Sequence, residues 1–244
     1  MAQIHIAEDP LEWVSSASRF IAAAAREALS ERNRFTLALS GGSTPRPVYE
    51  SLPETWQAHD LSWQQVHILW SDERCVALDH PRSNFRMARQ ALLDRIQIPA
   101  ENIHPMRCES DPLAAAQAYE TDLREIFPLM NWPRIDLVLL GLGTDGHTAS
   151  LFPHSEALEE RKRWIVTDEV SQAELPRLTL TIPAINAARR IAFLVAGAGK
   201  AAIIHTLLRE TERESDLPAQ AIDPLDGELH WLLDKAAAGK IIEP

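Results

Sequence analysis

A histidine and an aspartate stand in a glycine-rich segment, Gly141-Leu-Gly-Thr-Asp-Gly-His147, directly after the apolar run Ile135–Leu140. An imidazole can accept a proton near neutral pH and return it later, so His147 is a candidate general base. Asp145 is placed to orient the ring and to stabilise its charged form. Taken alone, the segment fits a structural histidine that caps the next helix equally well.

The same segment has the Gly141-x-Gly143-x-x-Gly146 spacing of dinucleotide-binding turns, with Asp168 at the place of the acid that binds ribose. However, Pro153 would interrupt the helix that such a turn opens, and the pattern lies in mid-chain. We therefore expect no nucleotide cofactor here.

A second candidate segment follows the apolar run Phe35–Leu39. Its glycines let backbone N–H groups point outward, its hydroxyls are further donors, and a helix N-terminus should follow, with Thr44 as its cap and Pro45 at its first position. A plain strand-to-helix turn is the alternative, and the lysine of a nucleotide-binding P-loop is absent. We predict a phosphate-binding loop formed by Ser40, Gly41, Gly42, Ser43 and Thr44.

Charged residues follow two further apolar runs. Asp72-Glu73-Arg74 comes after Val66–Trp70, and Lys200 comes after the run Arg190–Ala196 and its glycines. Arg74 could bind a phosphate or an oxyanion, and Asp72 could bind a sugar hydroxyl or act as a base. Lys200 could neutralise a phosphate. In isolation, each of these charges is more typical of a solvated surface.

Metal chemistry is not expected. None of the nine histidines pairs at the i, i+4 spacing of a helical zinc motif, and there is no cysteine cluster. We predict neither a metal nor a cofactor.

Apolar strand-like runs alternate with helical patterns, which predicts an α/β fold with a mostly parallel sheet and helices on both of its faces. A helix should begin at Asp9-Pro10. Ligands of such sheets bind beyond the carboxyl ends of the strands, where all the candidate segments lie. We expect residues 1–244 to form a single domain, because the polar stretch 210–226 is too short to divide it. Further helices are predicted over 85–96 and 113–127, and further strands, antiparallel or at an edge, over 178–182 and 229–233.

The composition restricts the partners. With 244 residues, 45% of them hydrophobic, and a net charge of −11, the chain can bury a full core and is poorly suited to duplex nucleic acid. Neither a secretion signal nor a membrane-spanning run is apparent. Cys75 and Cys108 are interpreted as two free thiols, consistent with a reducing cytoplasm.

Five segments, in order along the chain, resemble the 6-phosphogluconolactonase family. The resemblance extends from about Ile4 to the end of the run Trp231–Asp234. Cys75 stands where a more typical member has an aromatic residue. The matching segments are Leu39–Pro45, Trp70–Arg74, Gly141–Pro153, Pro176–Thr181 with Ile185-Asn186, and Gly197–Lys200.

The resemblance implies a fold shared with ribose-5-phosphate isomerase and glucosamine-6-phosphate deaminase, with a smaller appended part. It also implies cofactor-free hydrolysis of 6-phosphogluconolactone in the pentose phosphate pathway. His147 would then activate water for attack on C1, with the oxyanion held by loop N–H groups or Arg74. Arg74, Lys200 and the Ser40–Thr44 loop would bind substrate, chiefly its phosphate. The protein would be a monomer or a small homo-oligomer.

Two other functions are alternatives to lactone hydrolysis. A deaminase or isomerase of the same fold needs a carboxylate base, which Asp72 could supply. The deaminases, however, have an Asn-Glu pair shortly after the histidine, where this chain has Ser150-Leu-Phe-Pro153. A sugar-phosphate sensor would need an added basic DNA-binding module, for which the chain has no room.

Overall fold

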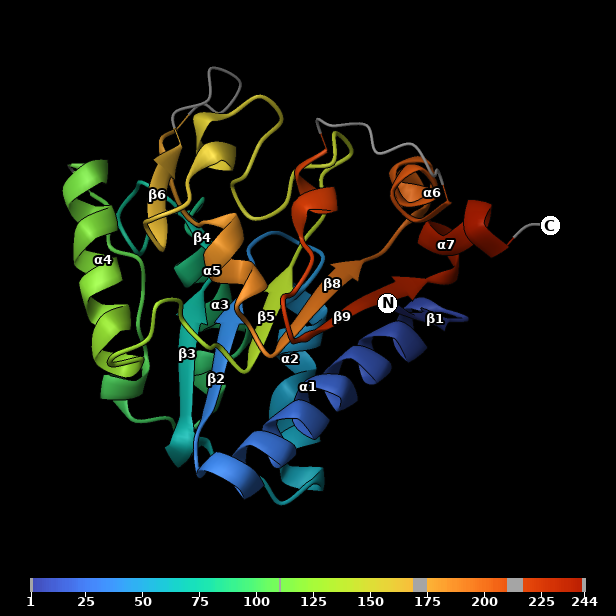
Figure 1. Ribbon diagram of the computed structural model, residues 1–244. Helices are drawn as coiled ribbons and strands as arrows, with labels where there is room; N and C mark the ends of the chain where they lie inside the picture. Colours follow the sequence, from blue (N-terminus) through green and yellow to red (C-terminus); the bar gives the residue numbers. More distant parts are fainter. Residues whose placement is uncertain (1, 110, 169–174, 210–216, 243–244) are drawn as a thin grey trace.

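The computed structural model describes residues 2–109, 111–168, 175–209 and 217–242. Its main sheet has six strands in the order β1-β9-β8-β5-β2-β3, and every pair of neighbours is parallel. A second sheet has three antiparallel strands in the order β4-β7-β6. Figure 1 shows this smaller sheet beyond the end of the main one. The predicted mostly parallel α/β fold is confirmed.

The strands of the main sheet are β1 (Gln3–Ala7), β2 (Phe35–Leu39), β3 (Val66–Trp70), β5 (Leu137–Leu140), β8 (Arg190–Val195) and β9 (Glu228–Asp234). Those of the small sheet are β4 (Asp72–Arg74), β6 (Ile165–Asp168) and β7 (Arg177–Leu180). The α-helices are α1 (Pro10–Arg32), α2 (Arg46–Ala58), α3 (Asn84–Ala91), α4 (Pro112–Ile126), α5 (Ile182–Asn186), α6 (Ala201–Arg209) and α7 (Lys235–Ile242).

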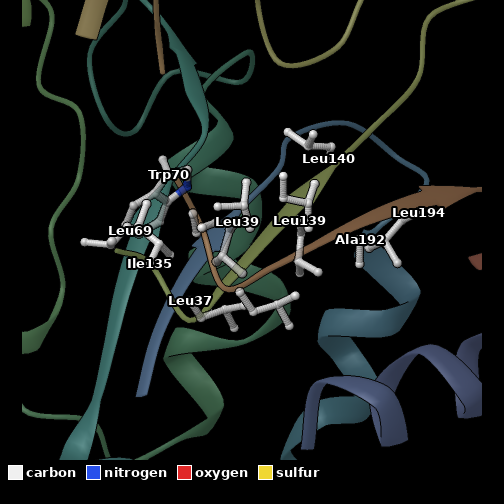
Figure 2. Close-up of a cluster of buried hydrophobic side chains, with 14 of the residues drawn as sticks. Leu37, Leu39, Leu69, Trp70, Ile135, Leu139, Leu140, Ala192 and Leu194 are labelled. Atoms are coloured by element: carbon white, nitrogen blue, oxygen red, sulfur yellow. The ribbon is translucent and has the colours of Figure 1, made fainter. Parts of the chain in front are cut away.

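The central strands form the core. Every residue of β2 and β5 is buried, as is β8 after its first residue, because both faces of a parallel sheet are covered. Leu37 and Leu39 of β2, with Leu139 and Leu140 of β5, belong to the buried cluster of Figure 2. This packing holds the carboxyl ends of the strands, and the loops that leave them, in a fixed arrangement.

The first helix begins as the sequence predicts. The Asp9 carboxylate accepts a hydrogen bond from the backbone N–H of Glu12 at 2.9 Å, and Pro10 occupies the first turn. Helix α1 packs against α2 and contacts β1, β9 and β2. The predicted cap of α2 is wrong, since Pro45 is its N-cap and the Thr44 side chain makes no capping bond.

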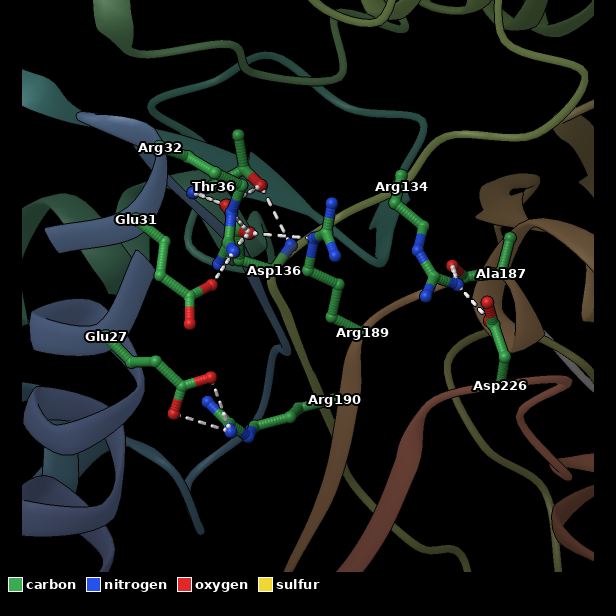
Figure 3. Close-up of polar contacts among 10 residues, drawn as sticks. All are labelled: Glu27, Glu31, Arg32, Thr36, Arg134, Asp136, Ala187, Arg189, Arg190 and Asp226. Carbon is green, nitrogen blue, oxygen red and sulfur yellow. Dashed lines mark hydrogen bonds and ion pairs between the residues drawn. The ribbon is translucent and has the colours of Figure 1, made fainter. Parts of the chain in front are cut away.

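A polar cluster fixes the opposite, amino end of the sheet (Figure 3). The buried Asp136 carboxylate accepts from the Thr36 backbone N–H at 2.9 Å and from its hydroxyl at 2.8 Å. Arg32 and Arg189 pair with the other oxygen at 3.1 and 3.4 Å. These bonds join α1, β2 and β5 far from the loops at the carboxyl ends, so we interpret the cluster as structural.

Of the two strands expected to be antiparallel or at an edge, one agrees with the expectation and one does not. The predicted strand near residues 178–182 is antiparallel, as expected, and lies in the small sheet as β7. The strand near 229–233 was expected to be antiparallel or at an edge, but β9 is parallel and lies between β1 and β8. The edge position is taken by β1, whose pairing with β9 no local pattern indicates.

The interpretation of the cysteines as free thiols is wrong. Cys75 and Cys108 form a disulfide with their Cα atoms 4.5 Å apart. Cys75 follows β4 directly, and its backbone N–H donates to the Pro176 carbonyl at 2.8 Å beside β7. Sequence spacing did not reveal the pair, because the two residues lie 33 positions apart and meet only through the tertiary fold.

The described residues bear only in part on the expected absence of a membrane span, the polar loop over 210–226 and the single domain. Within the described residues, no helix has the length and apolarity needed to cross a membrane. Of the predicted polar loop over 210–226, residues 210–216 lie outside the described part of the chain, and residues 218–221 form a 3₁₀ turn. The assignment of residues 1–244 to one domain stays a prediction.

Candidate active site

One cavity of about 250 Å³ opens at the carboxyl ends of β2, β3, β5 and β8. It brings together predicted residues from four separate segments, as the parallel sheet requires. Asp145 does not line it but contacts His147, which does. The predicted residues on its wall are Ser40, Gly41, Gly42, Ser43, Thr44, Asp72, Arg74, His147 and Lys200.

His147 and Asp145 form a hydrogen-bonded pair. The distance between His147 Nδ1 and Asp145 Oδ1 is 2.6 Å, and the same oxygen accepts from the His147 backbone N–H at 3.2 Å. Partial burial acts to raise the pKa of Asp145, but the charge and hydrogen bonds of His147 outweigh it and lower that pKa below its usual value. The ionised Asp145 accepts the Nδ1 proton, which leaves Nε2 as the ring nitrogen able to accept a proton.

The backbone before this pair leaves no room for a side chain. A Cβ atom on Gly143 would overlap His147 Nδ1 and Asp145 Oδ1. The Gly143 N–H also donates to the His147 carbonyl at 2.8 Å, which closes the loop on itself. The predicted catalytic pair thus depends on glycine at this position for a close approach, and not for a dinucleotide.

Asp168 ends β6 of the small sheet and does not line the cavity, and its carboxylate accepts a 2.7 Å hydrogen bond from the Ser155 hydroxyl.

Helix α2 supports the predicted phosphate loop through hydrogen bonds to its backbone. The buried Tyr49 hydroxyl donates to the Ser40 carbonyl and accepts from the Ser40 N–H, both at 3.0 Å. Gly42 has a φ of +94°, a left-handed conformation that favours glycine. Ser40 itself is buried, whereas Gly42 and Ser43 are exposed at the cavity.

The Asp72-Glu73-Arg74 triplet is not a solvated surface segment but the strand β4. Asp72 is 5% exposed and accepts from the Ser150 hydroxyl at 2.7 Å and from the Asn84 amide at 3.3 Å. Both of its carboxylate oxygens are therefore occupied. Glu73 is 1% exposed, and burial raises its pKa although three backbone N–H groups donate to its oxygens. Glu73 faces inward and supports the segment before α3.

Arg177 is a site residue that sequence reasoning missed. It pairs with Arg74 across β4 and β7, and both side chains line the cavity. Burial first, and then the positive charge of Arg74, lower the pKa of Arg177. The buried Nε atoms of both arginines lack a hydrogen-bond partner among the described residues. Two adjacent guanidinium groups with free donors favour an anionic ligand.

Phe152 contacts both the His147 ring and the Arg177 guanidinium. Its ring lies 4.6 Å from the His147 ring between centroids, and the Arg177 guanidinium lies 5.4 Å from its centroid. Arg177 belongs to the family-like segment Pro176–Thr181, but nothing local distinguishes it from other arginines. Only the pairing of β4 with β7 places it beside Arg74.

Lys200 lies where it was expected. It ends a short 3₁₀ turn, η5 (Ala198–Lys200), between β8 and α6, and its side chain lines the cavity. Together with Arg74 and Arg177 it gives this wall three positive charges. No group of three or more His, Cys, Asp or Glu side chains in the described part of the chain has the arrangement of a metal site.

Comparisons with known proteins show the family of the chain. Residues 8–231 match the family described as glucosamine-6-phosphate isomerases/6-phosphogluconolactonase. A 6-phosphogluconolactonase from Synechocystis sp. is 48% identical over 89% of both chains. One from Nostoc sp. is 45% identical over 88% of both. The crystal structure of 6-phosphogluconolactonase from Leishmania guyanensis superposes with a TM-score of 0.87 at 29% identity and covers 100% of each chain. The chain therefore belongs to the glucosamine-6-phosphate isomerase/6-phosphogluconolactonase family.

Proposed function

We propose that the chain hydrolyses 6-phosphogluconolactone to 6-phosphogluconate, with His147 as the general base. The observation that carries the proposal is the His147–Asp145 pair beside a cavity whose wall holds a phosphate loop and three cations. A phosphate dianion and one developing oxyanion together carry three negative charges, which these cations match. The Synechocystis and Nostoc relatives are named for this activity.

In the proposed mechanism, His147 Nε2 takes a proton from water while the water oxygen forms a bond to the lactone carbonyl carbon, C1. The carbonyl oxygen becomes an oxyanion, stabilised by the positive charges of Arg74 and Arg177. As the bond from C1 to the ring oxygen breaks, protonated His147 returns the proton to that oxygen. Hydrolysis opens the ring and leaves the acid, which ionises.

The Ser40–Thr44 loop and Lys200 are proposed to bind the substrate phosphate, with the arginines adding to the positive field. Phosphate binding would hold C1 beside His147, so that attack by water is effectively intramolecular. Loop hydroxyls and backbone N–H groups suit a phosphate without requiring a basic protein, in keeping with the net charge of −11.

Deamination or isomerisation of a sugar phosphate is the rival activity. It requires a carboxylate free to move a proton at carbon, but both oxygens of the buried Asp72 accept hydrogen bonds from Ser150 and Asn84. We therefore favour Asp72 as a group that orients its neighbours. A solved glucosamine-6-phosphate deaminase at 24% identity shares the fold, with a TM-score of 0.80.

The deciding assay uses freshly made 6-phosphogluconolactone and follows its hydrolysis above the spontaneous rate, beside glucosamine 6-phosphate followed for ammonia release. We expect lactone hydrolysis without ammonia release. Ammonia release in the absence of lactone hydrolysis would replace this proposal with the rival one.

Replacing Asp145 with asparagine should lower kcat by roughly 10- to 100-fold. The amide cannot stabilise a protonated His147, and it no longer fixes the tautomer that leaves Nε2 free. The loss should be smaller than in a fully buried dyad, because the Asp145 side chain is 45% exposed and water can partly replace it. Steady-state kinetics test this, and an unchanged kcat would remove Asp145 from the mechanism.

The ionised form of Asp145 should persist into mildly acidic solution, since its pKa lies below the usual value. Protonation of Asp145 should therefore not limit the rate in that range of pH.

A cytoplasmic location and a monomer or small homo-oligomer are part of the proposal, based on the class of reaction. The Cys75–Cys108 disulfide gives the location no support, because disulfides persist mainly in oxidising compartments.

A further inference from the structure

Asn84 is a buried polar residue on the cavity wall to which the reaction gives no step. It is the first residue of α3 and is 1% exposed. A buried amide is costly unless its donors and acceptor find partners, so its contacts show what it is placed to do.

The Asn84 amide bridges the two charged residues of β4. Its Oδ1 accepts from Arg74 Nη1 at 2.8 Å, and its Nδ2 donates to the Asp72 carbonyl at 2.9 Å and to Asp72 Oδ1 at 3.3 Å. Arg74 Nη1 also donates to the Arg82 carbonyl at 2.8 Å. Nη1 of the guanidinium is thus anchored by two acceptors, while its Nε has no hydrogen-bond partner among the described residues.

Asn84 also supports the phosphate loop. A Cβ atom on Gly41 would overlap the side-chain amide of Asn84, so the backbone of the loop lies directly against it. Through Asp72, whose other oxygen binds the Ser150 hydroxyl at 2.7 Å, the same network reaches the segment that follows His147. The phosphate loop and β4 therefore both contact the Asn84 side chain, and the segment after His147 is connected to it through Asp72.

Glu73 fixes Asn84 in turn. Its Oε1 accepts from the backbone N–H groups of Asn84 at 2.7 Å and Arg74 at 2.8 Å. Its Oε2 accepts from the Phe85 N–H at 2.8 Å and the Ser83 hydroxyl at 3.0 Å. The start of α3 is thereby attached to β4, which leaves the Asn84 side chain little freedom to move away from Arg74.

We propose that Asn84 is a positioning residue that presets the Arg74 guanidinium for the anionic substrate. The inference rests on the proposed lactonase function, but its effect on binding can be measured without turnover. Ordering a long side chain on binding costs about 0.5–1.5 kcal/mol, which corresponds to a loss of up to about tenfold in affinity.

The test measures the Kd of the product, 6-phosphogluconate, by isothermal titration calorimetry, together with kcat and KM for the lactone. We expect Asn84→Ala to weaken product binding by about five- to tenfold and to raise KM more than it lowers kcat. The control is Asn102→Ala, since Asn102 is 7% exposed and donates to the Gln64 carbonyl at 3.0 Å away from the cavity. That variant should leave Kd unchanged.

A double-mutant cycle separates positioning from general destabilisation. If Asn84 acts through Arg74, then Asn84→Ala should change Kd by less than about twofold in an Arg74→Ala background. Independent, multiplying effects would overturn the proposal. If Asn84→Ala does not fold, Asn84→Ser carries the same prediction, because serine is favoured at helix starts and its hydroxyl is too short to reach Arg74.

The outcomes also separate this inference from the function. Wild-type protein that binds 6-phosphogluconate but does not hydrolyse the lactone would contradict the function alone, and the Kd cycle would still decide the role of Asn84. Wild-type protein that does not bind 6-phosphogluconate would overturn both.

Discussion

Replacing His147 with alanine is expected to lower kcat for 6-phosphogluconolactone by about 10³-fold, while the Kd of 6-phosphogluconate changes by less than about threefold. The imidazole would be lost as proton acceptor and donor, whereas the phosphate loop, Lys200 and the arginines would remain. Among the described residues, the His147 ring forms a hydrogen bond only with the neighbouring Asp145, so its removal should leave the fold intact.

The measurement compares the rate with the spontaneous hydrolysis of the lactone, which sets the lower limit of the assay. His59→Ala is the matched control, since His59 is exposed at the end of α2 and away from the cavity. A variant that lacks His147 and keeps near-normal kcat would exclude it as the general base.

The second large effect concerns stability. Replacing Cys75 and Cys108 together with serine should lower the free energy of unfolding by about 3–4 kcal/mol, because the disulfide closes a loop with a sequence separation of 33 and so restricts the unfolded chain. Equilibrium unfolding in guanidinium chloride, performed on the oxidised protein and on the double variant, measures this difference.

Reduction provides the internal control for this experiment. A dithiol reductant should destabilise the wild type to about the level of the double variant and leave the variant itself unaffected. Equal unfolding midpoints for oxidised wild type and variant would contradict the expectation. The closed loop contains α3, so loosening it should also weaken product binding through Asn84 and Arg74.

The sequence predicted four strands of the main sheet and brought most of the candidate site residues to one edge of it, because these features depend on local patterns. Continuous apolar runs indicated β2, β3, β5 and β8, and their parallel arrangement placed Ser40, Arg74, His147 and Lys200 at one edge. The start of α1 at Asp9-Pro10 was also predicted, because the residues that form a helix cap are close together in the sequence.

What the sequence did not predict depends on contacts between distant segments. Arg177 joins the site through the antiparallel pairing of β7 with β4, and Cys75 reaches Cys108 only in the folded chain. Glu73, to which the sequence assigned no role within the charged triplet, is buried and accepts hydrogen bonds from backbone N–H groups at the start of α3. None of these partners can be inferred from spacing along the chain.

The pairing of β1 with β9 has a consequence for synthesis of the protein. Residues 3–7 leave the ribosome well before residues 230–234, with which they pair. Until those emerge, the nascent chain must carry an unpaired β1 and a helix α1 that lacks part of its packing surface. Pairing of β1 with β9 is therefore late relative to the synthesis of β1, and the growing chain is open to aggregation or chaperone binding at this edge until then.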